Sequence, residues 1–371
     1  MRMSLTTSAL LLSAAALVHA LPPSVPLHLD KGFWFGEFEV GTQTFTLPVD
    51  TGSFAILIEQ GKYLPSASAK QTNLSEFIQF NGASEDGTGP AEELPVFVLD
   101  DVKFAGVTVS NFLVGNITNG DPLPGDGVAG FSPPASDFSG GDPTTSSGQG
   151  LIETLCETGV VSPGQFGLTF GTDGNGSFIF GEMDTSKISG EVTTVPTTTK
   201  DSWSVNTTRT DSPLLVVDGK SFGQIQATFD SGSPNIIGPL DQVRTILGSI
   251  GYNISEQTND GITVALVRTR LLLLRHQRTY ILLTTSQGTY DCSRTPARFG
   301  FSFPPSSTVH YIDAGANVLN RTADGKICTA NVLGTSTVDS AEWSIRQTWF
   351  QGRYVQHDLD NNTLSFADLA P

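Results

Sequence analysis

Apolar positions along this chain fall in many short runs that are separated by glycine, aspartate, asparagine and proline. The clearest run, residues 33–41, alternates in part between apolar and polar side chains, which is the period of a β-strand. Helical patterns are predicted for residues 151–156, as a short amphipathic helix, and for residues 239–247. The pattern as a whole predicts an all-β fold with a few short helices.

The first twenty residues have a different pattern. A basic start precedes an apolar run from Ala9 to Val18, and a small-x-small sequence ends at Ala20. This run is too short to span a bilayer, but it is typical of a signal peptide. We predict that residues 1–20 are cleaved off and that the protein is secreted and extracellular. Asn-x-Ser/Thr sequons, which fit a glycoprotein, occur at Asn73, Asn116, Asn175, Asn206, Asn253, Asn320 and Asn361.

The length of 371 residues is enough for two domains of ordinary size. Charged residues make up 15% of the chain, and the net charge of −17 argues against nucleic acid or an anionic membrane as a partner. An acidic surface keeps a secreted protein soluble. We therefore expect an acid-tolerant secreted protein, and we expect it to be a monomer.

One motif occurs twice. Asp50 ends the apolar run of residues 45–49 and is followed by Thr51, Gly52 and Ser53. The second copy lies 180 positions later, where the corresponding residues are Asp230, Ser231, Gly232 and Ser233. Glycine allows a tight turn, and hydroxyls and amides of such a turn can hold a carboxylate. One copy would indicate an ordinary turn at a strand end, whereas two copies in corresponding halves indicate a paired site.

On these residues the chain resembles the pepsin-like aspartic proteases, especially the secreted fungal type. The resemblance extends from about Leu29 to the C-terminus. It implies a bilobal fold whose lobes, residues 21–190 and 191–371, each supply one catalytic aspartate, Asp50 and Asp230, to the cleft between them. Two adjacent carboxyls share one proton, so that one activates water while the other polarises the scissile carbonyl. No metal or organic cofactor is expected.

The resemblance also assigns supporting residues and shows departures. Thr51, Gly52, Ser53, Ser231, Gly232 and Ser233 are predicted to support the two aspartates, and Phe80, Asn81 and Gly82 to belong to a substrate-covering flap. Phe80 replaces the family's flap tyrosine, and we expect Leu57 to replace the tryptophan to which that tyrosine donates. Because donor and acceptor are lost together, no buried polar group is left without a partner.

A third departure is Arg346, which follows Trp343-Ser344-Ile345 where the family has glycine. Two interpretations are open. In the first, the chain shifts locally and Arg346 points to solvent. In the second, Arg346 lies near the cleft, where a cation favours ionisation of the pair of catalytic aspartates and its side chain obstructs the backbone path. Downstream, His357 is predicted to be a surface strand residue rather than a metal ligand.

Three cysteines leave one unpaired. The resemblance implies a disulfide between Cys292 and Cys328, the bridge of the family's second lobe. Cys156, in the predicted helix 151–156, is expected to be a buried free thiol rather than a nucleophile.

Residues 267–287 interrupt the resemblance. This stretch contains four arginines, four consecutive leucines and no acid. A membrane-binding hairpin and a surface insertion are two interpretations. A third hypothesis is a translated intron. The codon of Val267 begins with GT and that of Gln287 can be CAG, which match the usual borders of an intron, and a whole number of codons preserves the reading frame. If the segment is retained, we expect it to pack poorly.

The sequence therefore predicts a secreted acid endopeptidase. The alternative function is that of a catalytically impaired protein of the same fold that binds peptides or proteins. Only residues 21–30 separate the predicted signal from the fold, so the family's longer basic propeptide is not expected here.

Overall fold

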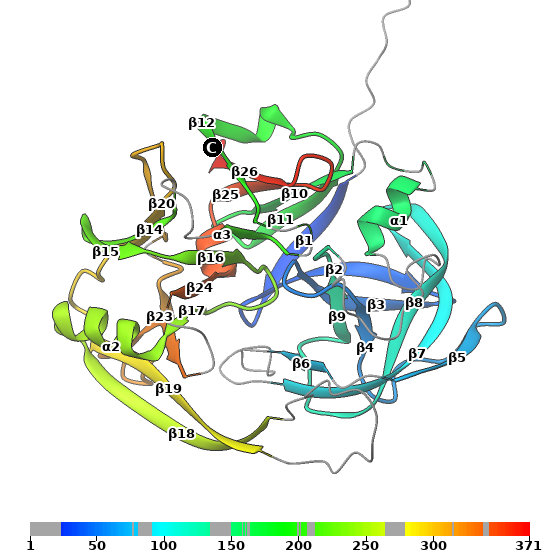
Figure 1. Ribbon diagram of the computed structural model, residues 1–371, viewed down its shortest axis with the longest axis horizontal. Coiled ribbons are helices and arrows are strands. Elements are labelled where there is room, and N and C mark those ends of the chain that lie inside the picture. The colour runs from blue at the N-terminus through cyan, green and yellow to red at the C-terminus, as the bar shows by residue number, and fades with distance from the viewer. Residues whose placement is uncertain are drawn as a thin grey trace, which may run out of the picture.

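The computed structural model describes residues 24–371 except 76–77, 81–90, 134–149, 158, 160, 162–163, 199, 201, 206–211, 264–278, 314 and 337–340. Figure 1 shows two lobes of strands, with the blue-to-cyan strands of residues 33–130 on the right and the green-to-orange strands of residues 214–335 on the left. The bilobal all-β prediction is confirmed. The predicted signal peptide, residues 1–20, lies outside the described residues, as do Asn81 and Gly82 of the predicted flap.

The largest sheet has fourteen strands and forms the first lobe together with the floor that connects both lobes. Its path runs β12-β26-β25-β10-β11-β1-β2-β3-β9-β4-β8-β7-β5, and β6 pairs with β7. The bounds are β1 Ser24–Asp30, β2 Phe33–Val40, β3 Gln43–Asp50, β4 Ile56–Ile58, β5 Lys70–Ser75, β6 Ile78–Phe80, β7 Ala91–Phe104, β8 Val107–Gly120, β9 Gly127–Gly130, β10 Gln165–Phe170, β11 Asn175–Phe180, β12 Ile188–Pro196, β25 Arg353–Asp358 and β26 Thr363–Leu369. The predicted domain boundary at residue 190 falls inside β12, and that division stays a prediction.

The described strands of the second lobe form two further sheets, one of eight strands and one of four. The first runs β13-β16-β24-β17-β23-β19-β18 with β22 beside β23, and the second runs β15-β14-β20-β21. The bounds are β13 Ser204–Val205, β14 Leu214–Val217, β15 Lys220–Gln224, β16 Gln226–Phe229, β17 Ile236–Pro239, β18 Asn253–Thr263, β19 Thr279–Asp291, β20 Phe299–Ser302, β21 Val309–Tyr311, β22 Val318–Arg321, β23 Ile327–Thr335 and β24 Glu342–Ile345.

The described helices are short. They are α1 Leu151–Glu157, the 3₁₀ helix η2 Thr185–Lys187, α2 Leu240–Ser249 and α3 Gln347–Phe350. Both predicted helices are present, and each end lies within two residues of the expected bound. None of the described helices is long and apolar enough to span a membrane. Cys156 is a free cysteine that is half-buried rather than fully buried, and burial raises the pKa of its thiol to about 11.

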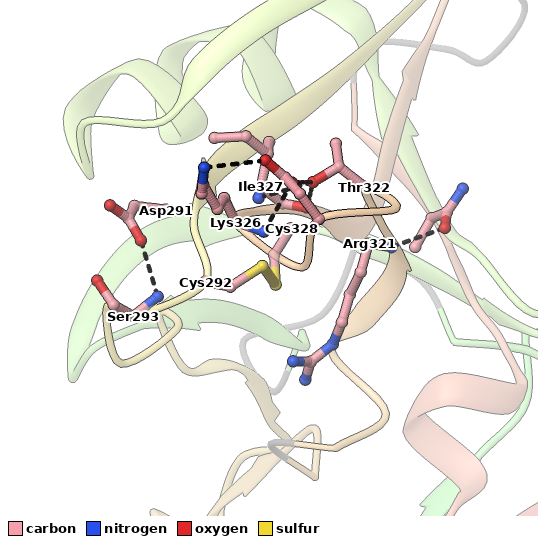
Figure 2. The surroundings of a disulfide bond; sticks show 10 residues. Asp291, Cys292, Ser293, Arg321, Thr322, Lys326, Ile327 and Cys328 are labelled. Atoms are coloured by element: carbon pink, nitrogen blue, oxygen red, sulfur yellow. Dashed lines mark hydrogen bonds and ion pairs between the residues drawn. A yellow bond between two sulfur atoms is a disulfide. The ribbon is translucent and has the colours of Figure 1, made fainter.

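The implied disulfide is confirmed. Cys292 and Cys328 are bonded, with a Cα–Cα distance of 5.1 Å, and Figure 2 shows the bridge between the end of β19 and the start of β23. Around it, Lys326 and Cys292 are joined by a backbone hydrogen bond of 2.8 Å, and the Asp291 carboxylate accepts the Ser293 amide at 2.8 Å. The bridge therefore fastens two neighbouring strands of the second lobe.

Two sequence predictions are wrong. His357 is not on the surface: it is completely buried, its ring stacks on Phe166 at 4.5 Å, and the edge of Trp203 packs against it. The cause is that β25 lies in the connecting floor, where every one of its residues is buried. Burial lowers the pKa of His357 to about 3, so the ring is neutral.

The described residues include only the last part of the anomalous segment, residues 267–287. Residues 264–278 are not described, but residues 279–287 belong to β19 and pair with β18. The last part also pairs with β23, where Ser286 is opposite Gly334 and is fully buried. Poor packing is therefore wrong for the end of the segment, while its origin as a translated intron stays a hypothesis.

Candidate active site

Both predicted aspartates lie at strand ends where the lobes meet. Asp50 is the last residue of β3 and is 6% exposed, while Asp230 follows β16 and its side chain is 13% exposed. Each strand is flanked by a parallel neighbour: β9 pairs with β3, and β24 pairs with β16. Apolar strands thus carry each carboxylate to the edge of a sheet, and the Gly-Ser turns that follow hold it there.

Four hydrogen bonds connect the two motifs across the lobe junction. The Thr51 hydroxyl donates to the carbonyl of Phe229 at 3.1 Å and accepts the Ser231 amide at 2.9 Å. Reciprocally, the Ser231 hydroxyl donates to the carbonyl of Val49 at 2.7 Å and accepts the Thr51 amide at 3.1 Å. All these groups are buried, so breaking one bond would leave polar atoms without partners. This network holds the two turns in one fixed relation.

The glycines of the motifs permit the carboxylates to face each other. A Cβ added to Gly232 would lie 2.2 Å from Asp50 Oδ1, and one added to Gly52 would lie 2.7 Å from the Asp230 carboxyl carbon. Such distances are far inside van der Waals contact. Each aspartate therefore packs directly on the backbone of the opposite motif, and side chains at these two positions would push the pair apart.

The Asp50 carboxyl has two donors that are local in sequence. The Gly52 amide donates to Oδ1 at 2.7 Å, and the Ser53 hydroxyl donates to Oδ2 at 2.6 Å. Burial and the nearby Asp230 outweigh these bonds and raise the pKa of Asp50 from 3.8 to about 7. The closeness of the two carboxyls therefore favours retention of a proton at this site.

Asp230 has a different environment. Its Oδ1 accepts the Gly232 amide at 2.8 Å, which repeats the arrangement in the first lobe. Its Oδ2 lies 3.0 Å from Nε of Arg346, whose side chain is 6% exposed. Of the two interpretations of Arg346, solvent exposure is thus wrong and the position near the cleft is correct. Ser233 is buried, and its carbonyl accepts the Gln347 amide at 3.1 Å.

The flap prediction can be followed only at Phe80, which ends β6 and pairs with Ala91. Phe80 is half-buried against an apolar cluster that contains Leu57, which is fully buried. Leu57 and Phe80, expected to replace a hydrogen-bonded pair, therefore belong to one apolar cluster. The role of Phe80 in covering substrate stays a prediction.

Sequence reasoning did not identify Gln347. Its side-chain amide donates to the carbonyl of Ser231, and its side chain also lines a cavity of about 590 Å³ between the lobes. That cavity is lined by Gly32 and Trp34 from the first lobe and by Pro234 and Thr348 from the second. The only available signal was its position directly after Arg346, in the segment that passes behind Asp230.

Comparison with known proteins gives a consistent result. The family model for eukaryotic aspartyl proteases matches residues 33–369. Secreted aspartyl protease 1 of Malassezia globosa is 24% identical over 340 residues, which cover 90% of this chain and 73% of that protein. Pepsin A of Sus scrofa is 26% identical over 379 residues, with coverage of 96% and 86%.

A solved structure supports the same fold. The aspartic proteinase from Irpex lacteus superposes with a TM-score of 0.70 at 17% identity, covering 94% of this chain and 97% of the other. Together with two carboxylates held at the lobe junction by a repeated motif, the family match places this chain in the eukaryotic aspartyl protease family.

Proposed function

We propose that the protein is a secreted endopeptidase that hydrolyses polypeptides in acid through Asp50 and Asp230. One observation carries the proposal: each carboxylate packs on the glycine of the opposite motif, so the two acids face each other at the lobe junction. Two carboxyls this close retain one proton between them. That arrangement supplies a base and an acid in one place.

The chemistry assigns a role to each part. The ionised carboxyl takes a proton from a water molecule, and the protonated carboxyl donates a hydrogen bond to the scissile carbonyl, whose oxygen gains charge as water attacks. Because burial and the nearby Asp230 raise the pKa of Asp50, we assign the acid role to Asp50 and the base role to Asp230. Thr51, Ser53 and Ser231 hold the carboxylates in position, and Phe80 contributes to a substrate cover.

Secretion and monomeric state belong to the same proposal. A relative is named as a secreted aspartyl protease, and the disulfide fits an oxidising compartment. Five of the sequon asparagines are exposed, as glycosylation requires: Asn73, Asn175, Asn253, Asn320 and Asn361. The acidic surface and the apolar segment of residues 1–20 support export of a soluble enzyme.

The experiment is acid proteolysis by purified Asp50→Asn and Asp230→Asn proteins. Asparagine preserves the size of the side chain but cannot exchange a proton, so either variant should lose at least about 10³-fold in kcat, the effect expected of a required acid or base. A matched control is Asp173→Asn, which changes an exposed acid in a first-lobe turn. Retained proteolysis in both dyad variants would reject the proposal.

A second candidate is supported by one observation, the ion pair between Arg346 and Asp230. A guanidinium on the proposed base neutralises part of its charge, and a protein impaired in this way could still bind a peptide between its lobes. The two candidates differ in a simple result: the binding protein would bind a statine-type peptide without cleaving any polypeptide.

A further inference from the structure

The two halves of the dyad are symmetric at one oxygen and different at the other. Oδ1 of each aspartate accepts the amide of a motif glycine, at 2.7 Å in Asp50 and 2.8 Å in Asp230. Oδ2 of Asp50 accepts the neutral hydroxyl of Ser53 at 2.6 Å, whereas Oδ2 of Asp230 lies 3.0 Å from Nε of Arg346. The second oxygen of the carboxylate therefore contacts a cation in the second lobe and a neutral hydroxyl in the first.

Strand register explains how a large side chain reaches this position. Asp50 is paired with Gly130 in the first lobe. In the second lobe Phe229 is paired with Ile345, so the next step places Arg346 beside Asp230. A Cβ on Gly130 would lie 2.6 Å from backbone atoms of three residues, which excludes any side chain there. Arg346 has extended backbone angles, φ −118° and ψ −172°, which any residue adopts.

The guanidinium is buried and has few partners. Its Nε–H donates to the Ser344 hydroxyl at 2.7 Å, and Nη1 is buried without a hydrogen-bond acceptor in the described part of the chain. Among the described residues, Asp230 is the one acid that pairs with it. A buried cation is tolerated only next to a counter-charge, and removing one partner is strongly unfavourable. Protonation of Asp230 would remove that counter-charge.

We propose that Arg346 fixes the charge of the dyad, so that Asp230 remains the carboxylate and Asp50 carries the single proton. Arg346 is then a positioning residue, because it acts on substrate only through Asp230. This inference rests on the proposed function. It adds that the single proton belongs to Asp50 and is not shared equally by the two aspartates.

The surrounding groups fit this assignment. The charged side chains that the described residues bring to this point are Asp50 from β3, Asp230 after β16 and Arg346 after β24. The remaining contacts are hydroxyls and backbone amides. With one proton on Asp50, the three charges sum to zero, which suits a buried site. A second proton, on Asp230, would leave a net buried cation.

The test compares the pH dependence of kcat/KM for the wild type, Arg346→Gln and Arg346→Lys. A cation within about 4–6 Å favours the charged carboxylate by roughly one to three pH units. The acid limb of Arg346→Gln should therefore move upward by about that amount, whereas Arg346→Lys should remain near the wild type. Arg244→Gln is the matched control, since it removes the same charge at an exposed ion pair.

Two activity results would overturn the inference. One is an acid limb in Arg346→Gln that coincides with that of the wild type. The other is an inactive wild type that becomes active in Arg346→Gln, because Arg346 would then silence the dyad rather than set its charge.

A second measurement is independent of activity. In protein labelled with ¹³C at the aspartate carboxyls, Asp50→Asn and Asp230→Asn identify the two signals. The wild type should show a carboxylate at Asp230 and an acid at Asp50 at the same pH. That result without proteolysis in any variant would reject the proposed function and retain the inference. The reverse order, or simultaneous titration, would overturn the inference even if Arg346→Gln failed to fold.

Discussion

Replacing Ser53 by alanine should displace the basic limb of the pH–activity profile. The Ser53 hydroxyl donates to Asp50 Oδ2 at 2.6 Å and stabilises the ionised form of that carboxyl. A hydrogen bond to a charged group contributes about 1.5–3 kcal/mol, and one pH unit corresponds to about 1.4 kcal/mol. Loss of the bond should therefore raise the pKa of Asp50 from about 7 by roughly one to two pH units.

The sign follows from the proposed roles. Activity requires Asp50 to hold a proton, so the basic limb marks the loss of that proton. In Ser53→Ala the proton is lost at higher pH, and the limb moves upward, although kcat falls because the carboxyl is held less firmly. The assay is cleavage of a peptide over a pH series from which kcat/KM is obtained.

The matched control is Ser233→Ala. Ser233 has the same position in the second motif, but its backbone carbonyl accepts the Gln347 amide, and Arg346 lies beside Oδ2 of Asp230. This variant should leave the basic limb unchanged. A basic limb that is unchanged or lowered in Ser53→Ala would refute the reasoning, as would equal shifts in both serine variants.

Three further predictions concern packing and stability. Gly232→Ala places a Cβ 2.2 Å from Asp50 Oδ1, so kcat should fall at least about 10²-fold. Thermal unfolding should still show a folded protein, and an unchanged kcat would contradict the close packing of Asp50 on Gly232. Burial and two acidic neighbours raise the pKa of Glu93 from 4.5 to about 8, so its contribution to stability is lost as pH rises between these values. In urea unfolding, Glu93→Gln should be as stable as the wild type near pH 4 and more stable than the wild type near pH 8. Equal stability of the two proteins at both pH values would contradict the raised pKa of Glu93. Replacing Cys292 and Cys328 by serine opens a loop with a sequence separation of 36 and should cost about 4 kcal/mol of unfolding free energy, whereas a loss below about 1 kcal/mol would argue against the chain-entropy account.

Repeated local patterns made much of this fold predictable. The two Asp-x-Gly-Ser turns, the strand that begins at Phe33 and both helices depend on short-range features such as side-chain period and glycine position. The disulfide came from the resemblance and not from spacing. The turns, the strand and the helices depend on residues close together in sequence, and the pairing of the two cysteines is a property of the family fold. The sequence was therefore enough to predict them.

The two errors, and the choice that the sequence left open at Arg346, depend on contacts between distant segments. Polar residues in a strand usually face solvent, but His357 lies in a strand that is covered on both faces, and nothing in its local sequence indicates that cover. The direction of Arg346 depends on space beside Asp230, which exists only after two lobes have packed. Residues 285–287 join a sheet through β23, a strand that follows them by about 40 residues.

The most direct test of the account is cleavage of a denatured protein by the purified chain from about pH 2 to 7, with and without a statine-type mimic of the transition state. A functional dyad should bind such a mimic about 10²-fold or more tightly than substrate. The account predicts cleavage in acid that the mimic abolishes at near-stoichiometric concentration. Absence of cleavage at every pH, or cleavage that the mimic does not affect, would contradict it.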